Sequence, residues 1–137
     1  MTPIVIQNQQ AAARLYPENA AFLSQLRQNR YIRESILPGD ISSFNFKPEA
    51  FYRQAWTTQT MRARGLFLNT LTNEIVIRAY DKFFNIGERR DTELVALEQT
   101  MTFPVRAWVK ENGFLGLVGY DSAAGGLVIA SKSTTEG

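Results

Sequence analysis

Residues 110 to 113 ("KENG") bring together residue types that could carry out chemistry: a lysine at 110, followed by Asn112 and Gly113. The Lys-x-Asn-Gly spacing is close to one in which a lysine amine attacks a nucleoside triphosphate, with a glycine that lets a bulky nucleotide approach the backbone. Asn-Gly between apolar runs is also a strong signal for a hairpin turn, which would leave Lys110 solvated at its rim. Taken alone, the motif favours a hairpin turn. The choice between a turn and an active-site lysine therefore depends on the other motifs in the chain.

The residue types that the chain lacks exclude several kinds of chemistry. Its 137 residues contain no cysteine and no histidine. That excludes disulfides, thiol chemistry, His-ligated zinc and Ser-His-Asp catalysis. Nucleotidyl transfer remains open, because it needs clustered cations around a charge-rich transition state and little acid–base machinery.

Composition fits one folded domain or a piece of one. Hydrophobic residues make up 45% and aromatic residues 12% of the chain, enough for a real core. The net charge of +2 is compatible with a phosphate-rich partner but does not argue for one. The amino terminus lacks the basic start of a secretory signal, and no uncharged apolar run could span a bilayer. We therefore expect a soluble, cytoplasmic protein.

The elements that must position these residues follow from periodicity. Pro17 and the spacing of Phe22, Leu23 and Leu26 predict a helix over 17–30. "LPGD" at 37–40 is typical of a turn, and the aromatic-rich stretch 42–56 is expected to be an irregular connection.

The rest of the chain reads mainly as strands. Residues 62–80 predict an antiparallel hairpin, with strands in "RARGLFLN" and "EIVIRAY" on either side of "TLTN". Residues 81–90 are expected to form a loop. A short helix with Asp91 as its N-cap should follow over 91–100, and then three strands within 103–133. Alternation over 105–110 would place Arg106, Trp108 and Lys110 on one face. We predict an α+β fold with mostly antiparallel sheet and a few helices.

Four motifs occur one after another along the chain, and their order and spacing carry information: "ARGLF" at 63–67, "YDKFFNIGE" at 80–88, "KENG" at 110–113 and "ASKS" at 130–133. Together they resemble the amino-terminal part of the adenylyltransferase domain of ATP-dependent RNA ligases. The phage-type RNA ligases and the ligase domain of fungal tRNA ligases are the most similar. The resemblance covers residues 40–137 and implies a nucleotidyltransferase (ATP-grasp-like) fold there, with 1–39 as an amino-terminal helical extension.

The resemblance also implies roles for individual residues. Lys110 would attack the α-phosphate of ATP and become lysyl-AMP. The AMP would then pass to an RNA 5′-phosphate, and a 3′-hydroxyl would displace it to seal the strand, with tRNA as one RNA that the resemblance admits. Mg²⁺ or Mn²⁺ would assist, and no metal ligand is assigned in this chain. The further site residues it implies are Arg64, Lys82 and Lys132 for ATP and phosphate binding, and Phe84, Glu111, Asn112 and Gly113 for the nucleotide pocket.

Several alternatives remain open at this point. Asn112 stands where many ligases have aspartate, which steers the resemblance toward the fungal tRNA ligases. Single basic residues are more often solvated charges, and Phe83, Phe84 and Trp56 could simply pack. Motifs that come later in such ligases are absent, so we expect a domain that is incomplete at its carboxyl end and weakly active alone. The competing functions are a non-catalytic RNA-binding module and a DNA ligase or capping-type nucleotidyltransferase.

Overall fold

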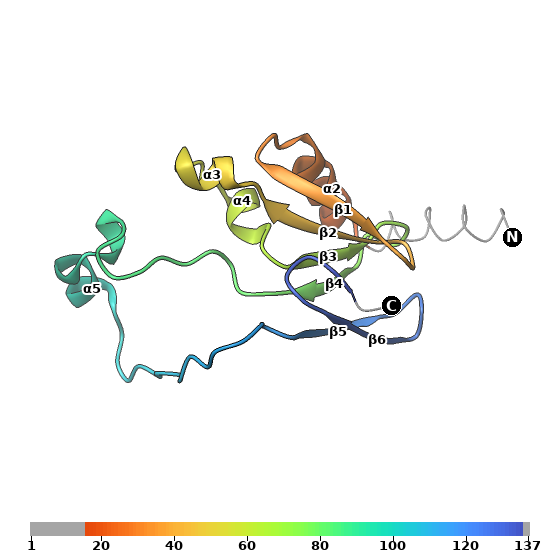
Figure 1. The fold of residues 1–137 in the computed structure, drawn as a ribbon. Coiled ribbons are helices and arrows are strands. Elements are labelled where there is room, and N and C mark those ends of the chain that lie inside the picture. Colours follow the sequence, from red (N-terminus) through yellow and green to blue (C-terminus); the bar gives the residue numbers. More distant parts are fainter. Residues whose placement is uncertain (1–15, 136–137) are drawn as a thin grey trace, which may run out of the picture.

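The computed structural model describes residues 16–135 and shows an α+β fold with two antiparallel sheets (Figure 1). The larger sheet has four strands in the order β1-β2-β3-β4, and the smaller one pairs β5 with β6. The predicted α+β class is confirmed. Its elements are α2 Pro17–Gln28, β1 Ile32–Leu37, β2 Ile41–Phe46, α3 Pro48–Tyr52, α4 Thr58–Arg62, β3 Leu66–Asn69, β4 Ile75–Arg78, η1 Arg90–Thr92, α5 Leu94–Thr100, β5 Leu117–Asp121 and β6 Gly126–Ala130.

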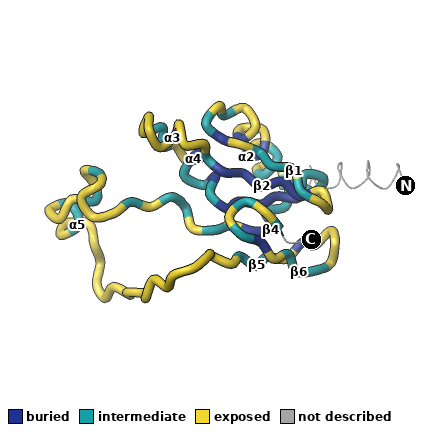
Figure 2. Tube along the Cα trace, in the orientation of Figure 1, coloured by how far each residue is buried: buried dark blue, intermediate teal, exposed yellow. Residues whose placement is uncertain are grey.

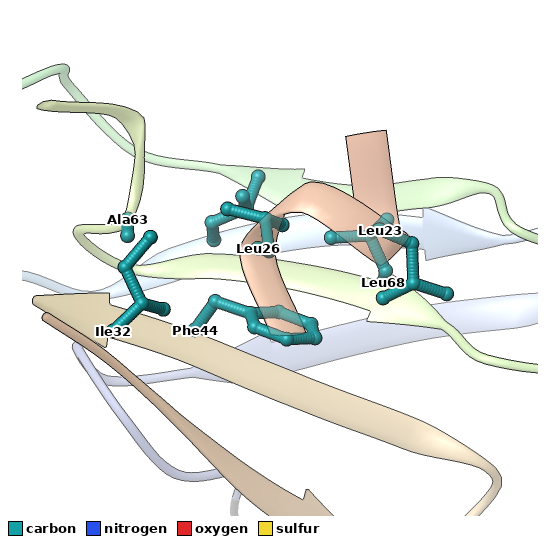
Figure 3. Packing of buried hydrophobic residues seen from close by; sticks show 7 residues of the cluster. Leu23, Leu26, Ile32, Phe44, Ala63 and Leu68 are labelled. Atoms are coloured by element: carbon teal, nitrogen blue, oxygen red, sulfur yellow. The ribbon is translucent and has the colours of Figure 1, made fainter. Parts of the chain in front are cut away.

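Helix α2 covers one face of the larger sheet. Proline opens the helix, as predicted, and the helix ends at Gln28. Its buried leucines, Leu23 and Leu26, pack with Phe44 of β2 and with Leu66 and Leu68 of β3 (Figure 3). The apolar spacing read from the sequence is therefore the helix's buried face.

The prediction of an irregular connection over 42–56 is wrong, because β2 and α3 occupy most of it. Ser42, Ser43 and Asn45 interrupt the apolar pattern of β2, yet all three are buried in the centre of the sheet. Their polar groups have partners: Ser43 Oγ donates to the Ser133 carbonyl at 2.8 Å, and Asn45 Oδ1 accepts from the Gly65 N–H at 3.0 Å. A buried strand can carry such residues when their hydrogen bonds are satisfied.

The β5–β6 hairpin covers the other face of the larger sheet. Phe67, which alternates with Leu66 and Leu68, packs there with Ile77 and with Ala130 of β6. The two sheets approach so closely that a Cβ on Gly119 would overlap the Val76 carbonyl oxygen. The result is three layers: α2, the larger sheet and the hairpin (Figure 2).

The predicted hairpin over 62–80 is confirmed as β3 and β4, with residues 70–74 between them. The expected domain boundary after residue 39 falls in the turn between β1 and β2, two paired strands of the same sheet. Residues 1–15 of the expected extension lie outside the described residues. Among residues 16–135, no helix combines the length and apolar character needed to cross a bilayer.

Residues 85–116, which we call the arm, leave the layers and return to them (Figures 1 and 2). The predicted short helix is present as α5, but Glu93 is its N-cap, and Asp91 lies in η1. The predicted strand over 105–110 is wrong: every residue from 101 to 116 is exposed, and none of them belongs to a strand. Alternating residues form a strand only beside another strand that takes their hydrogen bonds, and here there is none.

Candidate functional site

Three aromatic rings from separate parts of the chain meet beside the larger sheet. Phe46 ends β2, Trp56 lies between α3 and α4, and Phe84 lies in the loop after β4. The ring centroids are 5.1 Å apart for Phe46 and Trp56 and 5.6 Å apart for Trp56 and Phe84, both edge to face. We call these three residues the aromatic cluster, and it organises the cations around it.

Lys82 lies against this cluster. Its Nζ is 4.3 Å from the Phe84 ring centroid and 5.6 Å from that of Trp56. The same Nζ donates a hydrogen bond of 2.7 Å to the Phe83 carbonyl. The Lys82 backbone N–H donates to the Met61 carbonyl of α4 at 2.8 Å. Both the main chain and the ammonium group of Lys82 are therefore held.

Lys132 approaches the cluster from the opposite end of the chain. Its Nζ is 5.6 Å from the Phe46 ring centroid, just beyond the end of β6. The hydrogen bond from Ser43 to Ser133 ties this segment to β2. The β5–β6 hairpin thus brings Lys132 to the same aromatic residues that hold Lys82.

Arg64 lies next to Lys82. Its Nη1 donates to the Asp81 carbonyl at 3.5 Å, and its guanidinium carbon is 5.0 Å from the Phe83 ring centroid. Gly65 follows in a left-handed conformation with φ +62°, and a Cβ there would lie 2.9 Å from the Ala79 Cβ and 3.6 Å from the Lys132 carbonyl oxygen. This close approach joins the segments that carry Arg64 and Lys132.

The structure thus brings Lys82 and Lys132 to the aromatic cluster, which includes Phe84, and places Arg64 against Phe83 and Asp81, the residues on either side of Lys82. Clustered cations of this kind can hold a polyphosphate, with Arg64 offering a planar, multidentate group and the lysines point charges.

Lys110 is placed differently. It lies in the arm, where it is exposed, as are Glu111, Asn112 and Gly113. Asn112 and Gly113 form a bend in place of the expected hairpin turn, and Gly113 has φ +135°, in the region that favours glycine. Among the described residues, Lys110 makes no hydrogen bond, ion pair or cation–π contact. The structure therefore does not bring Lys110 into contact with the other three cations.

Two residues of this region were not assigned to a site from the sequence. Trp56 was expected to pack, and it does so as the central ring of the aromatic cluster. Arg89 pairs with Asp91 at 3.3 Å, and its guanidinium carbon is also 4.4 Å from the Phe84 ring centroid. The clue that could have revealed Arg89 is its position five residues after Phe84 in a loop closed by glycine.

Acidic side chains do not gather in a comparable way. Within residues 16–135 there is no group of three or more side chains from Asp, Glu, His or Cys arranged to hold a metal ion. Magnesium in nucleotide sites commonly binds through substrate phosphates and one or two carboxylates, and so does not require such a group.

Comparison with known proteins decides the family. Residues 62–137, more than half of the chain, match the RNA ligase family. The chain belongs to this RNA ligase family. The resemblance read from the four motifs is confirmed, and the match includes Arg64, Lys82, Lys110 and Lys132.

Two curated relatives are similar to this RNA ligase family member. The tRNA ligase of Candida albicans is 38% identical over 76 residues, which are 55% of this chain and 9% of the relative. The tRNA ligase 1 of Schizosaccharomyces pombe is 47% identical over 60 residues, 41% of this chain and 8% of the relative. The chain spans less than a tenth of the length of either relative, and what those whole proteins do is not thereby shown for it.

Proposed function

We propose that this chain is the amino-terminal part of an ATP-dependent RNA ligase domain with the nucleotidyltransferase fold. The observation that carries the proposal is the placement of Lys82 and Lys132 at the aromatic cluster and of Arg64 at Phe83, beside Lys82, in a chain that belongs to the RNA ligase family. These cations would hold the triphosphate of ATP and stabilise the charge on the departing pyrophosphate.

The proposed reaction has three steps. First, the neutral Lys110 Nζ attacks the α-phosphorus of ATP; a P–N bond forms, the bond to pyrophosphate breaks and Nζ loses a proton. Next, an oxygen of an RNA 5′-phosphate attacks the same phosphorus; the P–N bond breaks, Nζ takes up a proton, and AMP is left on the RNA end. Finally, a 3′-hydroxyl attacks the RNA 5′-phosphorus and loses its proton; a phosphodiester forms, the bond to AMP breaks, and AMP departs. The RNA is proposed to be tRNA or another RNA with these ends, by analogy with the relatives' names.

The first step requires that Lys110 move, because of where Lys110 lies in the structure. The described residues show no contact between Lys110 and the three gathered cations. For the reaction, the arm must carry Lys110 to the α-phosphate that the body holds. We therefore expect the 137-residue chain alone to transfer AMP weakly, and a longer ligase that contains it to transfer AMP strongly.

Mass spectrometry after incubation with ATP and Mg²⁺ tests the proposal, on such a longer ligase and on the 137-residue chain. We expect a mass gain of one AMP on Lys110 in the longer protein, absent in Lys110→Ala. Lys110→Arg should also fail, because a guanidinium stays protonated and cannot attack. Lys47→Ala is the matched control and should be labelled normally: Lys47 follows Phe46 in the chain but is exposed, and among the described residues it makes no cation–π contact with the cluster. Labelling of a different lysine would overturn the assignment, and strong labelling of the short chain would overturn the condition on the arm.

The separation of Lys110 from the other cations favours one alternative, a non-catalytic RNA-binding module. That function predicts salt-sensitive RNA binding that does not depend on ATP and is unchanged in Lys110→Ala. The family match favours RNA over the DNA ligase and capping alternatives, and competition between nicked RNA and nicked DNA tests that choice.

A further inference from the structure

Trp56 lies before the segment that matches the RNA ligase family, yet it touches the residues proposed to bind ATP. We infer that Trp56 is a positioning residue, whose indole holds the Lys82 ammonium and the Phe84 ring in the arrangement that receives the ATP phosphates. The inference rests on the proposed function, because its first test measures AMP transfer. Its second test measures phosphate binding and does not depend on AMP transfer.

The indole itself is held on several sides. Its ring packs edge to face on Phe46, at 5.1 Å between centroids, and near Phe51 at 6.4 Å. Its Nε1 donates to the Gln54 side-chain oxygen at 3.3 Å. Residues of β2, α3 and the turn after α3 thus set the orientation of Trp56, independently of Lys82 and Phe84.

Trp56 is one of three groups around the Lys82 ammonium, with the Phe84 ring and the Phe83 carbonyl, which accepts its hydrogen bond at 2.7 Å. The Lys82 backbone N–H is bonded to Met61 of α4, so the main chain stays in place without Trp56. The ammonium, in contrast, lies over the faces of two rings, Phe84 at 4.3 Å and Trp56 at 5.6 Å. A lysine side chain has four flexible carbons, and confining its ammonium beforehand lowers the entropy cost of binding a phosphate.

Trp56 also supports the Phe84 ring. The two centroids are 5.6 Å apart, and Phe84 carries a second cation, Arg89, at 4.4 Å. Removal of the indole would free one side of Phe84 and loosen both cations at once. The expected defect is therefore larger in binding of the phosphates than in the chemistry at Lys110.

The first test measures the kinetics of lysyl-AMP formation in a longer ligase that contains this chain. We expect Trp56→Leu to raise KM for ATP roughly tenfold and to lower kcat by less, since Lys82 keeps its charge and its bonds to Met61 and Phe83 and loses mainly its preorganisation for ATP binding. Trp56→Phe should restore most of the affinity. Tyr52→Leu is the matched control, because Tyr52 is an aromatic of the neighbouring helix that is 80% exposed.

A double-mutant cycle separates positioning from a general structural role. If Trp56 acts through Lys82, then Trp56→Leu adds little to the KM already raised by Lys82→Ala. Full additivity of the two effects, or an equal fall in kcat with KM unchanged, would overturn the inference.

The second test needs no AMP transfer. The chain has two tryptophans, so Trp108→Phe leaves Trp56 as its one fluorophore. We expect tripolyphosphate to change the emission of Trp56, because the phosphates bind the Lys82 ammonium beside the indole and alter the charge next to the ring, and Lys82→Ala to abolish the change. An emission that tripolyphosphate leaves unaltered would overturn the inference. Loss of Lys110 labelling together with an intact emission change would count against the proposed function alone.

Discussion

The layered body and the arm differ in what surrounds each side chain, although similar residues build both. Phe67 in β3 is 0% exposed, whereas Phe114 in the arm is 100% exposed. The hydrogen bonds of α5 and of the loop before it join residues of the arm to one another. The body is therefore stabilised by packing between distant segments, and residues 101–116 of the arm, which include Lys110, are not. The proposed nucleophile, Lys110, therefore lies in an exposed segment, whereas the residues proposed to bind the phosphates are held by contacts with the body.

The sharpest test of this difference replaces one phenylalanine in each region. Phe67→Ala should lower the free energy of unfolding by about 3–5 kcal/mol, because it removes a fully buried ring and leaves a cavity. Phe114→Ala should change it by less than about 0.5 kcal/mol, as for other exposed positions. Urea unfolding of both variants measures this, with similar m-values as the sign of unchanged two-state behaviour. Equal losses in both would show that the arm packs onto the body.

Sequence patterns predicted the elements that local signals determine. Pro17 with the spacing of Leu23 and Leu26 gave α2, and the apolar runs around residues 70–73 gave β3 and β4. The pattern failed at Ser42 and Ser43, whose burial depends on partners far along the chain, such as Ser133.

The site shows the same division between local and distant information. The motif residues Arg64, Lys82 and Lys132 were identified from their order, but nothing local indicated that Trp56 would touch Lys82. The strand predicted over 105–110 had the right alternation and no strand beside it. Alternation of apolar and polar residues indicates which side chains could lie on the same face of a strand. Whether the strand forms depends on a neighbouring strand that pairs with it.

A second pair of variants compares the glycines of the two regions. A Cβ on Gly119 in β5 would overlap the Val76 carbonyl, whereas a Cβ on Gly116 in the arm meets nothing within 4 Å. Gly119→Ala should therefore force the hairpin away from the sheet and cost about 1–3 kcal/mol of the free energy of unfolding. Gly116→Ala should be neutral or slightly stabilising, since alanine restricts the unfolded chain.

Thermal unfolding of the two glycine variants provides the measurement. Because the hairpin also carries Lys132, Gly119→Ala should weaken tripolyphosphate binding as well, and Gly116→Ala should not. A stable Gly119→Ala protein with normal binding would show that the hairpin is not held against β4.

The smallest effect concerns ion pairs. In the body, Arg27 of α2 donates two hydrogen bonds of 2.9 Å to the Glu34 carboxylate of β1. These bonds from Arg27 hold the pKa of Glu34 below its ordinary value of 4.5, although partial burial opposes the shift. In the arm, Arg89 and Asp91 make a single contact at 3.3 Å, with the Asp91 side chain 67% exposed. We expect Glu34→Gln to cost up to about 1 kcal/mol at pH 7 and Asp91→Asn close to nothing.

The contribution of the Arg27–Glu34 pair to stability is expected to depend on pH in one direction. Because the folded pKa of Glu34 is lowered, its contribution to stability is fully present above the unfolded value and is lost as pH falls through the folded value. The difference in free energy of unfolding between wild type and Glu34→Gln should therefore be constant at neutral pH. It should shrink in acid, beginning below pH 4.5. Urea unfolding at a series of pH values measures it, and raised salt at pH 7 should diminish it since the Arg27 side chain is 47% exposed. A difference that persists unchanged into strong acid would mean that Glu34 stabilises the α2–β1 contact by packing, and that Arg27 adds nothing to the firmness of the body.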